Sequence, residues 1–240
     1  MWPQIGAAAA GVSGAVSGVM YYAAAAPSSQ IFGPSLVRAG EPGSKCVALT
    51  FDDGPSESTP AVCEALADYG AKATFFQVGG NAERLPEVSR SVARAGHEIG
   101  NHTQTHPRFY LRTPGEIAWE IERGQRSLET VLGQRPRLFR PPYGVRWFGL
   151  YPALQRHGLR AVMWSVSSYD WERPEEWVAA QVIARAAPGD VVLMHDGDTT
   201  VPGDRRQGTA RAARAILKSF AERGIRAITV SELFGLQENA

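Results

Sequence analysis

Two adjacent aspartates, Asp52 and Asp53, follow an apolar run at residues 46–49. The run is aliphatic and β-branched, which is typical of a buried strand, and a Gly-Pro pair after the aspartates favours a turn. Like charges this close raise the pKa of one carboxyl group unless a cation lies between them. The pair therefore indicates that one aspartate binds a metal ion while the other transfers protons. A solvated turn rich in Asp and Gly is the alternative interpretation.

Two histidines four residues apart, His102 and His106, supply further candidate ligands. On a helical turn this spacing puts both imidazoles on one face, as a pair of zinc ligands requires. With Asp53 they would give three protein ligands and leave positions open for water, which is the pattern of a catalytic site. Zn²⁺ is the expected ion, and Co²⁺, Ni²⁺ or Fe²⁺ suit the same donors. His97 and His157 are interpreted as structural, because one falls inside a predicted strand and the other ends a predicted helix.

The composition is that of an ordinary globular protein. The chain has 240 residues, of which 44% are hydrophobic and 20% are charged, and its net charge is +1. This length supports a full core, and the charge gives no general attraction to nucleic acid or to anionic membranes. Cys46 and Cys63 lack the spacing of a zinc knuckle or a redox motif and are interpreted as buried thiols, although a disulfide between them stays open.

The stretch from Ile5 to Ala26 has no charged residue and is rich in Ala and Gly. As a helix it would measure about 33 Å, enough to cross a bilayer core. It is interpreted as an uncleaved membrane anchor, a secretory signal ending near Pro27, or a segment packed on the domain. The missing basic residues before it and the weak hydrophobicity of Ala and Gly argue against the first two. Export or attachment to the cell envelope is favoured over a cytoplasmic location, and the oligomeric state stays open.

Strand-like and helix-like stretches alternate from Lys45 onward, which predicts a parallel α/β fold. Without a dinucleotide-binding glycine pattern, seven such units favour a TIM-like (β/α)7 barrel over a Rossmann sheet. Residues 45–235 would form this domain, after an apolar segment and linker at residues 1–44. The strands are expected at residues 46–51, 73–78, 97–101, 138–140, 161–166, 191–194 and 227–230. The helices are expected at residues 59–69, 85–95, 114–132, 150–157, 175–187 and 209–223, and a glycine suited to ending a helix follows five of them.

Polar residues lie at or shortly after the ends of five of the predicted strands. In a parallel barrel the carboxyl ends of all strands face one mouth, so these side chains should converge there. This convergence is the main argument for catalysis. The residues are Asp52 and Asp53 after the first strand, His102 and His106 after the third, Arg140 after the fourth, Asp170 after the fifth and His195 after the sixth.

Five segments resemble, in order and in spacing, the motifs of the metal-dependent polysaccharide deacetylases. This family is carbohydrate esterase family four, also called the nodulation-factor deacetylase homology domain. The resemblance covers about Lys45 to Phe234 and implies a distorted (β/α) barrel, often with fewer than eight strands. The segments are residues 50–55, 102–106, 140–144, 170–171 and 192–197.

The resemblance implies a role for each converging residue. Asp53, His102 and His106 would hold the metal ion. Asp52 would take a proton from the attacking water, kept ionised by the metal and by Arg140.

The remaining motif residues would act on the leaving group and on the substrate. The backbone N–H of Tyr143 would help to hold the tetrahedral oxyanion. His195 would protonate the leaving amine, and Asp170 would orient His195 and raise its pKa. Trp171 and Leu193 would form the walls of a pocket for the acetyl methyl group, and Pro141 and Pro142 are assigned to the substrate-binding surface.

Two stretches depart from the family pattern. Residues 165–168 are mostly serines where many relatives carry carboxylates or Asn, which is expected to change the substrate groove but not catalysis. Residues 145–148 are bulky where many relatives are more polar, and Trp147 either stacks on a sugar face or packs at a helix start. The polar stretch at residues 198–207 would lie beside the mouth and shape substrate access.

The predicted function is removal of N-acetyl groups from an amino-sugar polymer or oligomer, such as peptidoglycan, a chitin-like oligomer or another polysaccharide. One alternative keeps the fold and the metal but hydrolyses a small non-sugar amide. The others are a carbohydrate-binding protein without catalysis and a membrane-anchored assembly protein that depends on the stretch from Ile5 to Ala26. No nucleic acid partner is expected.

Overall fold

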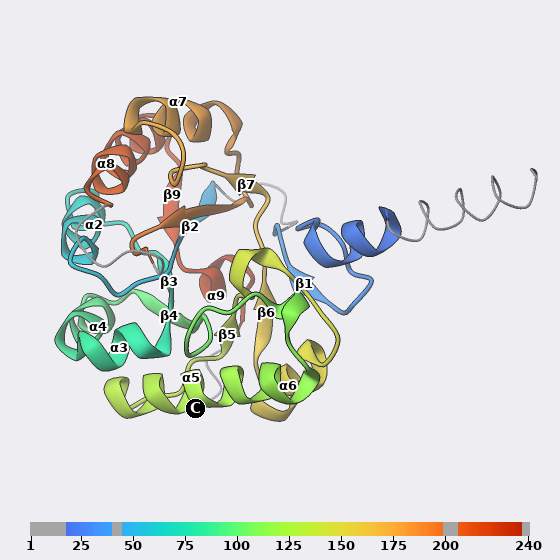
Figure 1. The fold of residues 1–240 in the computed structure, drawn as a ribbon. Coiled ribbons are helices and arrows are strands. Elements are labelled where there is room, and N and C mark those ends of the chain that lie inside the picture. Colours follow the sequence, from blue (N-terminus) through green and yellow to red (C-terminus); the bar gives the residue numbers. More distant parts are fainter. Residues whose placement is uncertain (1–17, 40–44, 199–205, 237–240) are drawn as a thin grey trace, which may run out of the picture.

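A computed structural model describes residues 18–39, 45–198 and 206–236, and within them nine strands form one sheet surrounded by helices (Figure 1). The strands are β1 (Ser35–Leu36), β2 (Cys46–Asp52), β3 (Thr74–Gln77), β4 (Glu98–Asn101), β5 (Leu138–Phe139), β6 (Arg160–Val162), β7 (Val166–Ser167), β8 (Val191–His195) and β9 (Arg226–Ile228). The helices are α2 (Thr59–Ala67), α3 (Gly79–Arg84), α4 (Pro86–Arg94), α5 (Pro114–Leu132), α6 (Leu150–His157), α7 (Glu175–Arg185), α8 (Gln207–Glu222) and α9 (Val230–Leu233). There are also two 3₁₀ turns, η1 (Phe109–Leu111) and η2 (Pro142–Gly144).

The paired strands of this sheet are parallel and run in the order β1-β6-β5-β4-β3-β2-β8-β7, with β9 also bonded to β2. The extended chain from β6 to β7 bonds first to β5 and then to β8, so the sheet bends round into a distorted barrel. The predicted (β/α) barrel is confirmed. The single strand predicted at residues 161–166 is wrong in detail, because the chain changes its hydrogen-bonding partner between Val162 and Val166.

Alternation along the strands decides which side chains reach the barrel interior. In β2, Leu49 and Phe51 pack outward against the helices, so Thr50 and Asp52 point inward on the same side as Ala48. The register pairs Asp52 with His195 on β8. Two polar residues predicted for the site are thus neighbours on the inner wall.

The end of the barrel away from the mouth is closed by α9, which lies within the ring of helices in Figure 1. Its Val230 and Leu233 pack among inward-facing residues of the strands. His97 and His157 lie toward this end, because His97 precedes β4 and His157 ends α6. His97 is buried with its ring 5.4 Å from that of Phe75.

The other predicted elements agree with the structure within about two residues at each end, and α5 and α6 have the predicted bounds. Two short helices, α3 and α9, were not predicted. The α3 sequence has two glycines and no apolar periodicity, so nothing in it indicates a helix. Cys46 is buried, Cys63 is half-buried, and both are free thiols in this structure.

The segment predicted as a linker contributes to the sheet. β1 pairs with β6, and Arg38 bridges to Asp190, so the linker prediction is wrong for this part of residues 27–44. Residues 40–44 lie outside the described residues, as do residues 5–17 of the stretch from Ile5 to Ala26. Residues 18–25 are helical. No helix among the described residues is long and apolar enough to cross a bilayer.

Arg146 fixes the N-terminal segment to the barrel. Its side chain is buried and donates hydrogen bonds to the carbonyl oxygens of Ser29 (2.8 Å), Pro27 (3.3 Å) and Ala24 (3.4 Å), and also to that of Ala26. No carboxylate pairs with it among the described residues. The carbonyl dipoles at the end of the helical residues 18–25 therefore compensate the buried charge.

Replacing Arg146 with Met should destabilise the protein by about 3 kcal/mol, because several buried carbonyl groups lose their donors. Thermal unfolding would then begin about 6–12 °C lower for a chain of this size. The matched control is Arg112→Met, since the Arg112–Glu116 pair is exposed and such pairs add little to stability. Equal unfolding midpoints for the two variants would contradict this account.

Candidate active site

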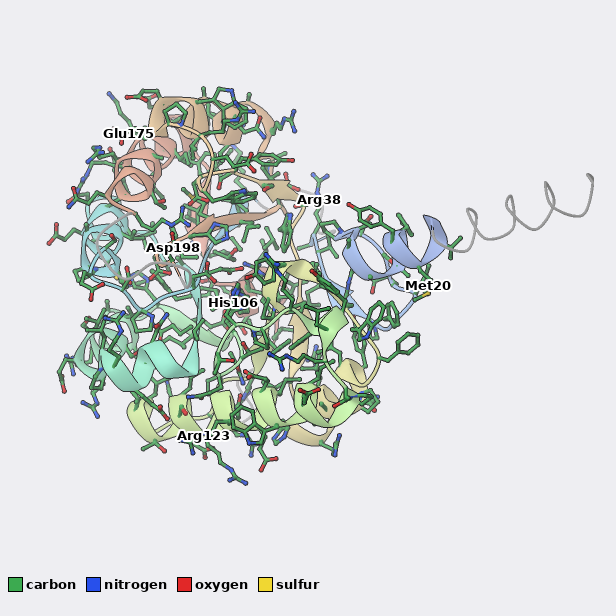
Figure 2. All side chains as sticks on the ribbon, viewed as in Figure 1. Met20, Arg38, His106, Arg123, Glu175 and Asp198 are labelled. Atoms are coloured by element: carbon green, nitrogen blue, oxygen red, sulfur yellow. The ribbon has the colours of Figure 1, made fainter. Side chains whose placement is uncertain are left out.

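The predicted site residues meet where the strands end, inside the ring of helices. His106 and Asp198 are labelled near the centre of the view in Figure 2, whereas Arg123 and Glu175 lie on the outer helices. Asp52 and His195 are the last residues of β2 and β8, His102 follows β4, and Arg140 follows β5. The predicted convergence at the mouth is confirmed for these strands.

Asp53, His102 and His106 form a buried cluster that fits a metal ion. Asp53 Oδ1 lies 3.5 Å from His102 Nε2 and 3.1 Å from His106 Nε2. One ligand atom from each residue lies within 4.8 Å of the others. The set matches the three ligands predicted from the sequence.

The protonation pattern of this cluster favours a cation between the three side chains. His102 Nδ1 lies 2.7 Å from the carbonyl oxygen of Arg140, which can only accept, so in the neutral imidazole Nδ1 carries the proton and Nε2 presents a lone pair. That lone pair faces Asp53 Oδ1, a buried oxygen that accepts no hydrogen bond in the described structure. With His102 neutral, these two electron-rich atoms repel each other, and a metal ion between them removes the repulsion.

The pKa values of Asp53 and His106 are shifted toward the ionisation states that metal binding requires. Burial raises the pKa of Asp53, but His102 and His106 outweigh it, so the pKa lies below its ordinary value. Burial lowers the pKa of His106 to about 4, although Asp53 opposes this shift. A carboxylate and neutral imidazoles are the forms that bind metal ions.

The segment between the two histidines is a loop, so the helical turn predicted there is wrong. Thr103 and His106 have positive φ values of 72° and 58°, which no α-helix contains. The Oγ1 atom of Thr103 accepts a hydrogen bond from the N–H of His106 at 3.0 Å. The loop nevertheless brings the rings of His102 and His106 to 4.8 Å between centroids.

Helix α5 supports this loop through two residues that the sequence analysis missed. The carboxylate of Glu120 accepts hydrogen bonds from the N–H groups of Gln104 (3.0 Å) and Thr105 (2.9 Å). A Cβ atom at Gly124 would lie 2.7 Å from the backbone of Thr103, so only glycine allows this approach. A glutamate on the apolar face of a predicted helix was the signal that could have revealed the support.

Asp52 forms a buried ion pair with Arg140. Arg140 Nη1 donates to Asp52 Oδ1 and to Thr50 Oγ1, each at 2.7 Å. Its other N–H groups donate to the carbonyl oxygens of Val162 (3.2 Å) and Met163 (3.0 Å). Burial lowers the pKa of Arg140 and Asp52 opposes this shift. The pair fixes Asp52 so that Oδ2 lies 3.8 Å from His102 Nε2, next to the metal cluster.

His195 and Asp170 form the second charged pair. His195 Nδ1 lies 2.7 Å from Asp170 Oδ1, and Asp170 Oδ2 accepts from the backbone N–H of His195 (2.8 Å) and from Thr209 Oγ1 (3.0 Å). Burial opposes protonation of His195, but Asp170 outweighs it and raises the pKa of His195 to about 9. Burial raises the pKa of Asp170, and His195 reverses this to a net lowering. The imidazole is therefore protonated at neutral pH.

The residues predicted to contact the substrate surround these groups. Tyr143 has a positive φ of 56°, and its exposed ring lies 4.7 Å from that of His106. Leu193 is buried on β8 and shares the inward face with His195. The ring of Trp171 meets that of His195 edge-on at 5.2 Å. Pro141 and Pro142 are buried beside Arg140 in the chain.

Asp196 is a further buried carboxyl group that the sequence analysis did not single out. Thr59 Oγ1 donates to its Oδ2 at 2.5 Å, and a Cβ atom at Gly54 would lie 2.3 Å from the same oxygen. Burial raises the pKa of Asp196 to about 7. Asp196 thus occupies the space that a side chain after Asp53 would need, which explains the glycine there.

Trp147 packs against neighbouring aromatic rings. Its ring lies 6.3 Å from that of Phe32 and 5.3 Å from that of Phe148, and it covers the cluster around α6. These contacts support the packing interpretation of Trp147. Of the polar stretch predicted at residues 198–207, residues 199–205 lie outside the described residues.

A three-ligand metal cluster between two charged pairs, at the mouth of a (β/α) barrel, defines a metal-dependent hydrolase. The profile of the polysaccharide deacetylase family matches residues 39–162. A chitooligosaccharide deacetylase from Azorhizobium caulinodans is 40% identical over 187 residues, 74% of this chain and 89% of the relative. The chain belongs to the polysaccharide deacetylase family.

Solved structures agree with this assignment. The crystal structure of a peptidoglycan N-acetylglucosamine deacetylase has a TM-score of 0.78 at 32% identity and covers 85% of this chain and 94% of its own. A pseudoenzyme of the same family from Bacillus anthracis has a TM-score of 0.74 at 26% identity, over 84% and 69% of the two chains. The family therefore includes a member without activity, which makes the residues of the site the decisive feature.

Proposed function

We propose that this chain hydrolyses N-acetyl groups of an amino-sugar oligomer or polymer, with Zn²⁺ as the resident ion. The observation that carries the proposal is the position of the Asp53–His102–His106 cluster beside the Asp52–Arg140 and His195–Asp170 pairs. The relatives named as chitooligosaccharide and peptidoglycan deacetylases support the substrate class. They do not favour a small non-sugar amide as the substrate.

Asp53, His102 and His106 would hold the ion. When bound, it supplies positive charge that polarises an amide carbonyl and makes a water molecule more acidic. Asp52 is the proposed base, because Arg140 occupies its Oδ1 and leaves Oδ2 directed toward the cluster. A carboxylate positioned in this way takes the proton of the attacking water at Oδ2.

His195 is the proposed acid. Its Nδ1 donates to Asp170, so its Nε2–H is the proton available to the amine nitrogen as the C–N bond breaks. Asp170 stabilises the imidazolium before this transfer and holds the ring in one orientation. The backbone N–H of Tyr143 is the proposed donor to the oxyanion, and Trp171 and Leu193 are the proposed walls of the acetyl pocket.

The experiment that tests this function measures acetate release from N-acetylglucosamine oligomers by the full chain. The full chain is used because Arg146 needs the carbonyl groups of residues 24–29. A chelator should abolish release, and Zn²⁺ or Co²⁺ should restore it. His102→Ala should lose both bound metal and release, whereas His157→Ala, near the opposite end of the barrel, should keep both. Full release by a metal-free protein would overturn the proposal.

We also propose a localisation and a membrane association for this chain. Export or attachment to the cell envelope is supported by the uncharged stretch from Ile5 to Ala26, and membrane association would act through the same stretch. Fractionation of cells expressing the full chain and a variant without residues 1–17 tests both, since a soluble cytoplasmic full chain would contradict them.

A further inference from the structure

Tyr169 has a positive φ of 58°, which is unfavourable, and it has no role in the proposed mechanism. Positive φ is unfavourable for residues other than glycine, and such residues gather at functional sites. In the described part of the chain all five of them lie in loops at the mouth of the barrel, and four belong to the metal-binding loops or to the Tyr143 turn. The five are Asp53, Thr103, His106, Tyr143 and Tyr169.

Tyr169 is the third ring in a row of four that begins at His195. The Trp171 ring lies 5.2 Å from the His195 ring, and the Tyr169 ring lies 5.4 Å from that of Trp171. The Trp177 ring follows at 6.2 Å from Tyr169. Because Trp177 lies in the first turn of α7, the row leads from the proposed acid to the rim of the barrel.

The three rings beyond His195 are partly open to solvent. Trp171 is 42% exposed, Tyr169 39% and Trp177 40%. Single exposed aromatic residues are common, and Trp119 on α5 is one, but exposed rings that touch one another beside a polar site are typical of ligand-binding surfaces. We therefore interpret the three exposed rings as a ligand-binding surface and not as core residues that are only partly buried.

The turn that carries the row is fixed to the site. The N–H groups of Glu172 and Arg173 both lie 3.1 Å from the carbonyl oxygen of Tyr169. Asp170, between Tyr169 and Trp171, is bonded to His195. The Arg173 guanidinium lies 5.3 Å from the centre of the Trp177 ring. A ligand on this surface would consequently be held at a fixed distance from His195.

We propose that Tyr169 and Trp177 form a sugar-binding subsite for the unit next to the one that is deacetylated. The inference rests on the proposed function and narrows it to oligomers and polymers. Sugar rings present apolar C–H faces that pack on aromatic rings. They are uncharged, so their binding does not require an ionic contact with Arg173. The row continues without a gap from Trp171 at the acetyl pocket, so its occupant is part of the same substrate chain.

The test compares kcat/KM for N-acetylglucosamine oligomers of one to five units in the full, zinc-loaded chain. In the wild-type protein kcat/KM should rise with length, and in Trp177→Ala the ratio between pentamer and monomer should fall about fivefold or more. Tyr169→Asn is the second variant, because Asn tolerates positive φ better than other residues. Trp119→Ala is the matched control for removal of an exposed tryptophan and should keep the wild-type ratio.

Binding of the pentamer to the chelator-treated proteins, measured by calorimetry, separates the subsite from the reaction. Weaker binding by Trp177→Ala than by Trp119→Ala would support the subsite, even if the wild-type protein released no acetate and the proposed function failed. Acetate release with the same length dependence in Trp177→Ala and wild type would keep the function and overturn the subsite.

Discussion

Asp52→Asn should lower kcat/KM for acetate release by about 10²–10⁴-fold, the usual contribution of a general base. The amide has no basic oxygen, so the attacking water keeps its proton. Metal content should not change, because Asp53, His102 and His106 are untouched. Acetate assays and metal analysis on the same preparation give both results.

Stability must be separated from catalysis in this experiment, because Asp52 also compensates the buried charge of Arg140. Removing one member of a buried ion pair costs about 3–5 kcal/mol. Asn retains an oxygen that can accept from Arg140 Nη1, whereas Ala does not. Asp52→Ala should therefore lose as much activity as Asp52→Asn but unfold at a lower temperature. Wild-type activity in a folded Asp52→Asn protein would remove Asp52 as the base.

The inner wall of the barrel was predictable from local sequence. Alternation in β2 puts Asp52 on the inward face, and the parallel register brings it beside His195 on β8. Arg140 follows β5 in the same manner. Strand direction and a period of two residues were sufficient to predict that these side chains meet.

The loops were less predictable, because contacts distant in sequence decide their shape. Residues 102–106 follow a spacing that suits a helix, but Glu120 and Gly124 on α5 hold them as a loop. Arg146 was interpreted only as one of several bulky residues. Its partners are carbonyl groups more than one hundred positions earlier. Every residue has a backbone carbonyl group, so such acceptors cannot be recognised from the amino-acid sequence.

Packing also decides the interpretation of exposed aromatic residues. From the sequence, Trp147 was assigned either a sugar contact or a packing role, and Trp171 was assigned to the wall of the acetyl pocket. The structure gives the two rings different neighbours. Trp147 is half-buried between Phe32 and Phe148, whereas the exposed ring of Trp171 meets that of His195. The residues in contact with an aromatic ring, rather than the ring itself, distinguish a core residue from a ligand surface.

Asp170→Asn should shift the alkaline limit of activity to lower pH. Asp170 raises the pKa of His195 to about 9, so the wild-type imidazole is protonated at neutral pH and loses this proton as the pH rises. A bound metal ion adds positive charge nearby and brings the wild-type limit below 9. Without the carboxylate the imidazolium loses its main stabilisation, so the limit moves further down. A pH profile of kcat measures the shift, with a loss of about 10²-fold or more expected at pH 8.

Asp190→Asn is the matched control, because Asp190 is a buried aspartate directly before the other end of β8 and bonds to Ser165 and Arg38 instead of His195. It should lower stability without moving the alkaline limit.

The pH dependence of stability supplies a second readout. The folded-state pKa of His195 is raised, so its stabilising contribution is complete below the unfolded value near 6.5 and is lost as the pH rises through about 9. The thermal midpoint of the chelator-treated wild type should therefore fall between pH 6.5 and 9, and that of Asp170→Asn should fall less. Coincident pH profiles of activity for wild type and Asp170→Asn would show that Asp170 only supports the fold and that His195 acts without it.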